Sequence, residues 1–172
     1  MVSLLFLPQS PSRAAAAKGS KTMNVTSTAF KEGEMIPEVY SCDGKNISPR
    51  IDWDGSPKGT KTFALIVDDP DAPRGTWVHW VLFNIPADAK GLPEHIPPRS
   101  TLSNGARHGV NDSRLLGYDG PCPPGGIHRY YFKLYALDVV LALESGATKA
   151  QLLKAMEGHI VGEGALMGKY KR

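Results

Sequence analysis

Three apolar runs, each bordered by segments rich in proline and glycine, constrain the fold of this chain more than any other feature. Thr62 to Val67 is continuously apolar after its first residue, which is typical of a strand buried on both faces. A second strand is expected from about Thr76 to Ile85, and a strongly aromatic third strand from His128 to Leu137. Because turn-forming residues separate these runs, the sequence predicts a mainly β fold.

One helix is expected near the C-terminus, over about residues 149–159. Thr148 and Gln151 match a capping box, in which each residue bonds the backbone of the other. Apolar side chains follow at helical spacing at Leu152, Leu153, Met156 and Ile160. Residues 86–117 are rich in proline, glycine and polar side chains, and they are expected to run over the surface. The pattern favours a β-sandwich or β-barrel with long ordered loops and a peripheral C-terminal helix.

Length and charge indicate one folded domain. The 172 residues suffice for one well-buried core. Residues 1–22 are interpreted as a leader or disordered segment, because the apolar stretch at 2–7 is short and no basic region precedes it, and Met23 is taken as a plausible natural start. Residues 23–172 then form the domain. The net charge of +3 arises from three basic residues in the first thirty, so the domain itself is balanced and lacks the basic block of a nucleic-acid binder.

The compartment and the cysteine state are less constrained. No apolar run reaches the roughly 18 to 20 residues that a membrane-spanning helix needs. A cytoplasmic protein is expected, with a periplasmic or secreted one as the alternative. Cys42 and Cys122 fit no CxxC or zinc-binding spacing, and they are either bridged or free. No metal or cofactor is expected.

Polar residues at the ends of the first two strands suggest a functional site. If these strands form a hairpin folded about Pro73 and Arg74, Asp69 falls opposite His79, because paired residues of a hairpin have a nearly constant number sum. On the second strand Trp77 and His79 then share a face. Both polar residues also have structural interpretations: Asp69 as the acceptor of an Asx-turn, and His79 as a buried core histidine.

The third strand brings another histidine. The stiff segment 120–126 delivers His128 to the start of this strand. Imidazoles that lie near a carboxylate favour the charged form, and two of them could hold a phosphate or carboxylate group. The backbone amides of Gly125 and Gly126 would add donors if they converge on the same anion.

Several segments resemble a known family. Asp-Pro-Asp-Ala-Pro at 69–73, Trp-Val-His-Trp at 77–80 and Gly-Pro-Cys-Pro-Pro-Gly-Gly-Ile-His-Arg-Tyr at 120–130 resemble motifs of the phosphatidylethanolamine-binding protein family. The match is to its bacterial and archaeal Raf-kinase-inhibitor-like branch. Segments 41–53 and 158–170 resemble the early motif and the C-terminal segment of that branch, so the resemblance covers nearly all of residues 24–172.

The resemblance implies two packed sheets with an anion-binding pocket at one end. It assigns the pocket to Asp69, His79 and His128. Neighbouring or wall positions fall on Asp71, Trp77, Gly126 and Tyr130. It also implies a cis bond between Ala72 and Pro73. Because Cys122 and Pro123 stand where the mammalian members have a proline or lysine, kinase inhibition is not carried over.

The leading hypothesis is a non-enzymatic module that binds a small phosphate- or carboxylate-bearing ligand, such as a phospholipid headgroup. Alternatives are a hydrolase acting on esters or phosphate esters, and a regulatory protein that docks a kinase or another protein partner. A homodimer is left open. A metal site of two histidines and a carboxylate lacks supporting spacing. Cys122 as a nucleophile with His128 as base depends on contact across an intervening run of prolines.

Overall fold

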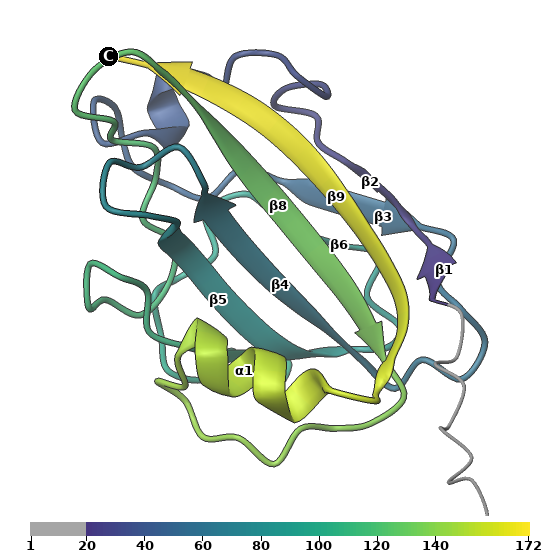
Figure 1. Cartoon of the computed structure of the whole chain (residues 1–172). Helices are drawn as coiled ribbons and strands as arrows, with labels where there is room; N and C mark the ends of the chain where they lie inside the picture. Colours follow the sequence, from purple (N-terminus) through teal and green to yellow (C-terminus); the bar gives the residue numbers. More distant parts are fainter. Residues whose placement is uncertain (1–19) are drawn as a thin grey trace, which may run out of the picture.

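The computed structural model describes residues 20–172, which form two β-sheets, a short 3-10 helix and one α-helix (Figure 1). The elements in chain order are β1 (Lys21–Thr22), β2 (Asn24–Thr26), η1 (Glu38–Tyr40), β3 (Ile51–Asp54), β4 (Thr62–Asp69), β5 (Trp77–Pro86), β6 (Gly91–Leu92), β7 (Arg107–His108), β8 (Ile127–Leu137), α1 (Lys149–Met156) and β9 (Ile160–Lys171). The large sheet has the order β1-β9-β8-β4-β5-β7 and the small sheet the order β2-β3-β6. The predicted class, two packed sheets with a C-terminal helix, is confirmed.

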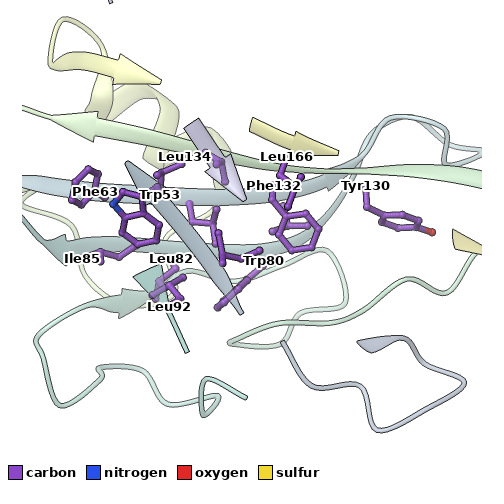
Figure 2. Packing of buried hydrophobic residues seen from close by; sticks show 14 of the residues in the cluster. Trp53, Phe63, Trp80, Leu82, Ile85, Leu92, Tyr130, Phe132, Leu134 and Leu166 are labelled. Carbon is purple, nitrogen blue, oxygen red and sulfur yellow. The ribbon is translucent and has the colours of Figure 1, made fainter. Parts of the chain in front are cut away.

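The large sheet forms the middle layer of three. One of its faces packs on the small sheet through a cluster that includes Trp53 of β3, Phe63 of β4 and Trp80 of β5 (Figure 2). The other face packs on α1, with Leu152 and Met156 of the helix against Ile66 of β4. Figure 1 shows α1 crossing the sheet on the side opposite β2 and β3. Apolar side chains on both faces explain why the central strands read as continuous apolar runs.

The three strands expected from sequence are present. Thr62–Asp69 forms β4, which is buried at every position and lies between β5 and β8. The other two expected strands are β5 and β8, with ends within about one residue of the prediction. The alternating burial of β8 matches its alternating aromatic pattern.

Two β-bulges change the expected hairpin register of β4 and β5. Thr62 pairs with Pro86, a number sum of 148, but shifts after Phe63 and after Val67 bring Asp69 opposite Trp77. The prediction that Asp69 faces His79 across the hairpin is therefore wrong. The second bulge also breaks alternation: Val78 joins the helix-side cluster, while His79 packs against Tyr130 on the other face. A bulge that re-aims one side chain in this way is common next to functional sites.

Strand β9, the longest strand among residues 20–172, was not expected from sequence. Ile160, expected to continue the helical spacing, lies in β9, and α1 ends at Met156 instead of near residue 159. The strand carries Gly162, Gly164 and Gly168, which argue against a strand on propensity grounds. A Cβ at Gly164 would lie 2.3 Å from the Met23 carbonyl oxygen, so glycine is required here by the close approach of the N-terminal segment.

Four further observations concern the expected leader, the helix cap, segment 86–117 and membrane-spanning helices. The leader expected at 1–22 lies outside the described residues except for 20–22, of which Lys21–Thr22 form β1 parallel to β9. The capping box of Thr148 and Gln151 is present at α1. Segment 86–117 contains the short strands β6 and β7 and buries His108 and Asn111, so it is more than a surface excursion. No helix in residues 20–172 is long and apolar enough to cross a membrane.

Candidate ligand-binding site

A pocket of about 370 Å³ lies where β4 ends, β5 begins and β8 begins. Its walls come from the 69–77 turn, the 113–124 segment and the turn that follows η1. The lining residues are Cys42, Asp69, Ala72, Pro73, Trp77, His79, Ser113, Asp119, Gly120, Cys122, Pro123, Pro124, His128 and Tyr130. The three residues expected to form the site are thus brought together. Of the expected neighbours, Trp77 and Tyr130 line the pocket, whereas Asp71 and Gly126 do not.

Asp69 and His128 form the deepest polar pair. His128 Nδ1 donates to Asp69 Oδ2 at 2.7 Å, and both side chains are almost fully buried. The other carboxylate oxygen of Asp69 accepts the backbone N–H of Asp71 at 2.7 Å. The expected Asx-turn is therefore present, and it coexists with the contact to His128. Because both oxygens of Asp69 are engaged, the carboxylate orients the imidazole and compensates a positive charge on it.

His79 is held by the backbone. Its Nδ1 lies 2.7 Å from the Asp119 carbonyl oxygen, which can only accept, so Nδ1 carries the proton of the ring. Burial lowers the pKa of His79, despite partial compensation by Asp119 and other nearby acids. The imidazole is therefore neutral near pH 7. Its Nε2, with no protein partner among residues 20–172, is an acceptor available to a ligand.

Tyr130 supplies a third polar group. Its ring packs edge-on against His79 with centroids 5.2 Å apart. Figure 2 shows its phenolic oxygen turned away from the other labelled side chains of the apolar cluster. The hydroxyl makes no well-formed hydrogen bond with the described residues. Burial, with a contribution from the nearby Asp69 carboxylate, raises the pKa of Tyr130, so the hydroxyl keeps its proton and can donate to a ligand.

Asp71 lies outside the pocket and pairs with Arg129. Its carboxylate accepts two hydrogen bonds from the Arg129 guanidinium, at 2.7 and 2.8 Å, and one from the Arg129 backbone N–H at 3.0 Å. The Arg129 side chain lowers the pKa of Asp71 to about 2. This pair ties the 69–77 turn to β8 directly beside His128. The Ala72–Pro73 bond in this turn is trans, contrary to the expectation of a cis bond.

The lining residues that sequence reasoning did not assign to the site include Cys42, Ser113, Asp119 and Cys122. Asp119 holds His79 through its backbone carbonyl, an acceptor that every residue carries and that no side-chain motif reveals. The Asp119 carboxylate accepts from Ser113 and from Asn46. Cys42 and Cys122 form a disulfide in the pocket wall, which settles the alternative between bridged and free thiols.

The remaining histidines lie away from the pocket. His108 is fully buried and bonds the Arg99 carbonyl oxygen through Nδ1, while His159 pairs with Asp138. Within residues 20–172 there is no group of three or more His, Cys, Asp or Glu side chains arranged to hold a metal ion. The polar groups that line the pocket are two oriented imidazoles, a phenol, the Ser113 hydroxyl and the carboxylates of Asp69 and Asp119.

Comparison with known proteins identifies the fold and the family. The family model described as phosphatidylethanolamine-binding protein matches residues 26–171. The chain belongs to the phosphatidylethanolamine-binding protein family. A UPF0098 protein of Methanothermobacter thermautotrophicus is 56% identical over 150 residues, which cover 87% of this chain and 99% of that protein. A UPF0098 protein of Aquifex aeolicus is 48% identical, covering 90% of this chain and 91% of the relative.

Solved structures agree with this assignment. A phosphatidylethanolamine-binding protein homologue from Chlamydia trachomatis superposes with a TM-score of 0.81 at 44% identity, covering 89% of this chain and 99% of that one. E. coli YbcL, described as a new member of the mammalian family, gives a TM-score of 0.81 at 35% identity, covering 87% and 98%. The resemblance inferred from the motifs at 69–73, 77–80 and 120–130 is confirmed.

Proposed function

We propose that the pocket binds a small ligand through a phosphate or carboxylate group, as in a phospholipid headgroup or a free phosphate ester. One observation carries the proposal: two imidazoles in one pocket are each fixed through Nδ1, which leaves both Nε2 atoms for a ligand. Membership of a family named for binding phosphatidylethanolamine supports it. Fixed donors and acceptors lose little entropy when they bind, so a small anion suffices to occupy them.

The two imidazoles are not equivalent, and their difference favours a particular ionic form. His128 beside Asp69 can carry a proton on each ring nitrogen and donate through Nε2, and the Tyr130 hydroxyl is a second donor. Neutral His79 instead accepts through Nε2. Two donors and one acceptor match a phosphate that still carries one proton. Two anionic oxygens accept hydrogen bonds from the protein, and the P–OH donates one to it.

Calorimetric titration with inorganic phosphate and with sulfate tests this assignment. Phosphate affinity should rise as the pH falls from about 8 to 6, because the singly charged ion H2PO4⁻, with two accepting oxygens and a further P–OH donor, replaces the doubly charged ion HPO4²⁻ as the main species over this range. Sulfate has the same shape but no proton at these pH values, so it should bind more weakly than phosphate. Equal affinity for both ions, or no dependence on pH, would contradict the role given to His79.

Variants separate the three ligand contacts. His128→Ala should weaken phosphate binding by about tenfold or more, because a hydrogen bond to a charged group contributes about 1.5 to 3 kcal/mol. Tyr130→Phe removes one neutral donor and should cost less. His159→Ala, which removes a histidine that pairs with Asp138 away from the pocket, serves as the control and should leave phosphate affinity unchanged. Unchanged affinity in His128→Ala would rule out this pocket as the phosphate site.

We further propose that the protein binds without turnover. Both pocket cysteines are bonded to each other, and the Ser113 hydroxyl donates to the Asp119 carboxylate, so neither is paired with His128 as a nucleophile. Incubation with aryl ester and aryl phosphate substrates should give no product beyond one equivalent per protein. Product accumulation that His79→Ala abolishes would favour the hydrolase alternative.

The cytoplasmic location expected from sequence stays a prediction. The Cys42–Cys122 disulfide supports the alternative, a periplasmic or secreted protein, because disulfides persist mainly in oxidising compartments. A kinase or other protein partner and a homodimer also stay predictions.

A further inference from the structure

The disulfide joins two parts of the pocket wall that are distant in sequence. Cys42 lies in the turn after η1, and Cys122 lies in the 120–126 loop, 80 residues later. Both sulfur-bearing residues line the pocket, as do Pro123 and Pro124 of the loop. The same loop leads directly to His128 at the start of β8. A change in this bond therefore acts on the wall of the site itself.

The Cys42 side of the bond is rigidly anchored. Ser41 is fully buried and its hydroxyl donates to the Tyr170 hydroxyl of β9 at 2.8 Å. Asp43 accepts from Tyr170 at 2.9 Å and pairs with Arg172 at 3.0 Å. The residues on both sides of Cys42 are thus bound to the end of the large sheet, and Cys42 is a fixed attachment point.

The Cys122 side has few other attachments. The loop is held before Cys122 by two hydrogen bonds, from the Gly120 N–H to Asn46 at 2.7 Å and from the Cys42 N–H to the Pro121 carbonyl oxygen at 3.1 Å. Strand pairing begins again at Ile127. Between these points, residues 122–126 make no backbone hydrogen bond to the rest of the described chain outside the strand pairing. The disulfide is the main tether of this stretch.

The bond is also accessible and lies beside a cation. Cys122 is exposed, and the Arg172 guanidinium lies 3.6 Å from its sulfur atom, as measured from Nη1. A guanidinium at this distance attracts an incoming thiolate and stabilises a thiolate formed on Cys122. Buried structural disulfides have neither property.

From these observations we infer that the Cys42–Cys122 disulfide is a site of exchange with low-molecular-weight thiols and that its opening weakens the ligand pocket. A thiolate attacks Cys122 Sγ, the bond between the two cysteines breaks, and the electron pair leaves on Cys42 Sγ, which takes a proton from water. A second thiolate attacks the outer sulfur of the mixed disulfide and releases Cys122 as a thiolate. Two small thiols are oxidised to one disulfide while the protein disulfide is reduced to two thiols.

The chemical part of the inference is tested on the folded protein without denaturant. After incubation with glutathione, free thiols are alkylated and counted by mass spectrometry, while far-UV circular dichroism follows the fold. The bond should open with the β signal intact. Arg172→Gln should slow opening by about threefold, the scale of one solvent-screened charge, whereas Arg50→Gln, an exposed arginine paired with Asp52, should leave the rate unchanged. Resistance to glutathione until the protein unfolds would overturn the inference.

The effect on the pocket rests on the proposed function and is measured separately. Phosphate should bind about fivefold more weakly to the reduced protein and to the Cys42→Ser/Cys122→Ser variant than to the oxidised protein, because the wall is no longer held in its bound position. Equal affinity in the oxidised and reduced forms would overturn the coupling. If phosphate binds neither form, the proposed function fails, and hydrogen exchange then tests the tether on its own. Faster exchange after reduction at the Gly120 and Cys42 amides, which are hydrogen-bonded where the loop meets the turn after η1, supports the tether, and unchanged exchange refutes it.

Discussion

Strand β4 ends in two neighbouring carboxylates that serve opposite faces of the large sheet. Asp68 lies on the helix side, where it pairs with Lys133 of β8 at 2.8 Å and with Lys149 at the start of α1 at 2.5 Å. Asp69 lies on the pocket side and pairs with His128. Both carboxylates are almost fully buried, so each needs compensation for the loss of water.

The two carboxylates have different kinds of partner. The two lysines at Asp68 join β4, β8 and α1 into one unit. The partner of Asp69 is an imidazole whose other nitrogen faces an open pocket. The same residue type at adjacent positions therefore joins layers of the fold on one face and orients an imidazole at the pocket on the other. This contrast leads to four predictions, in order of decreasing effect.

The largest effect is expected from Asp68→Asn. Breaking a buried ion pair costs about 3 to 5 kcal/mol when the remaining charge stays buried, but both lysines reach solvent, so we expect a loss of about 2 kcal/mol in the free energy of unfolding. Urea denaturation measures this loss. Phosphate affinity should change little, and a parallel loss of affinity would contradict the separation of the two faces.

The matched variant Asp69→Asn should show the opposite result. An amide N–H would face His128 Nδ1 in place of a carboxylate oxygen, so this ring nitrogen must accept instead of donate and the ring loses the negative charge beside it. Phosphate affinity should fall by about tenfold, because the Nε2–H donor is no longer strengthened by a carboxylate on the other side of the ring. The free energy of unfolding should fall less than in Asp68→Asn, because the amide oxygen can still accept the Asp71 N–H. Calorimetry and urea denaturation of both variants under one set of conditions check the contrast.

Two buried histidines should make the free energy of unfolding depend on pH, with an effect of intermediate size. Burial lowers the pKa of His79 on the pocket side and of His108 in the core below the ordinary 6.5. Below pH 6.5 the unfolded chain therefore binds protons that the folded chain does not, and stability falls as the pH decreases. Each histidine contributes at most about 1.4 kcal/mol per pH unit. His108→Gln should reduce the slope of unfolding free energy between pH 6.5 and 5.5, and an unchanged slope would exclude His108 as a contributor.

The smallest effect is expected at Asp71, whose ion pair with Arg129 is partly exposed and screened by solvent. Its pKa is lowered from 3.8 to about 2, so its contribution is present above about pH 4 and is lost as the pH falls through 2. Asp71→Asn should therefore reduce stability far less than Asp68→Asn at pH 6. The stability curves of Asp71→Asn and of the unmodified protein should converge near pH 2. Denaturation midpoints across this range measure the difference. A loss as large as that of Asp68→Asn would show that this turn is structural as well.

The parts of the fold that follow from local patterns could be predicted from sequence. The apolar run of β4, the alternation of β8 and the capping box of α1 each depend on residues close together in the chain. Strand β9 could not be predicted, because Gly162, Gly164 and Gly168 are required by partners from distant segments. The β4–β5 register was predicted with an error of two residues, because two bulges leave no signature in the apolar pattern.

The site shows the same division. The sequence predicts Asp69, His79 and His128 in one pocket, but hairpin geometry alone pairs Asp69 with His79. The actual partner, His128, lies on the neighbouring strand β8, whose register no short-range rule fixes. The acceptor of His79 is a backbone carbonyl, and the Cys42–Cys122 bond spans 80 residues, so neither leaves a motif.

The strand order of the large sheet determines when the site can form during folding. Strand β4 meets β5 through a short turn but meets β8 only after nearly sixty further residues have been closed into a loop. Loop-closure entropy makes the first contact fast and the second slow. Asp69 therefore has no partner until β8 pairs with β4. In the early β4–β5 hairpin, the carboxylates of Asp68 and Asp69 are exposed to water. Ligand-binding competence should accordingly appear in the last kinetic phase of refolding, after the hairpin is complete.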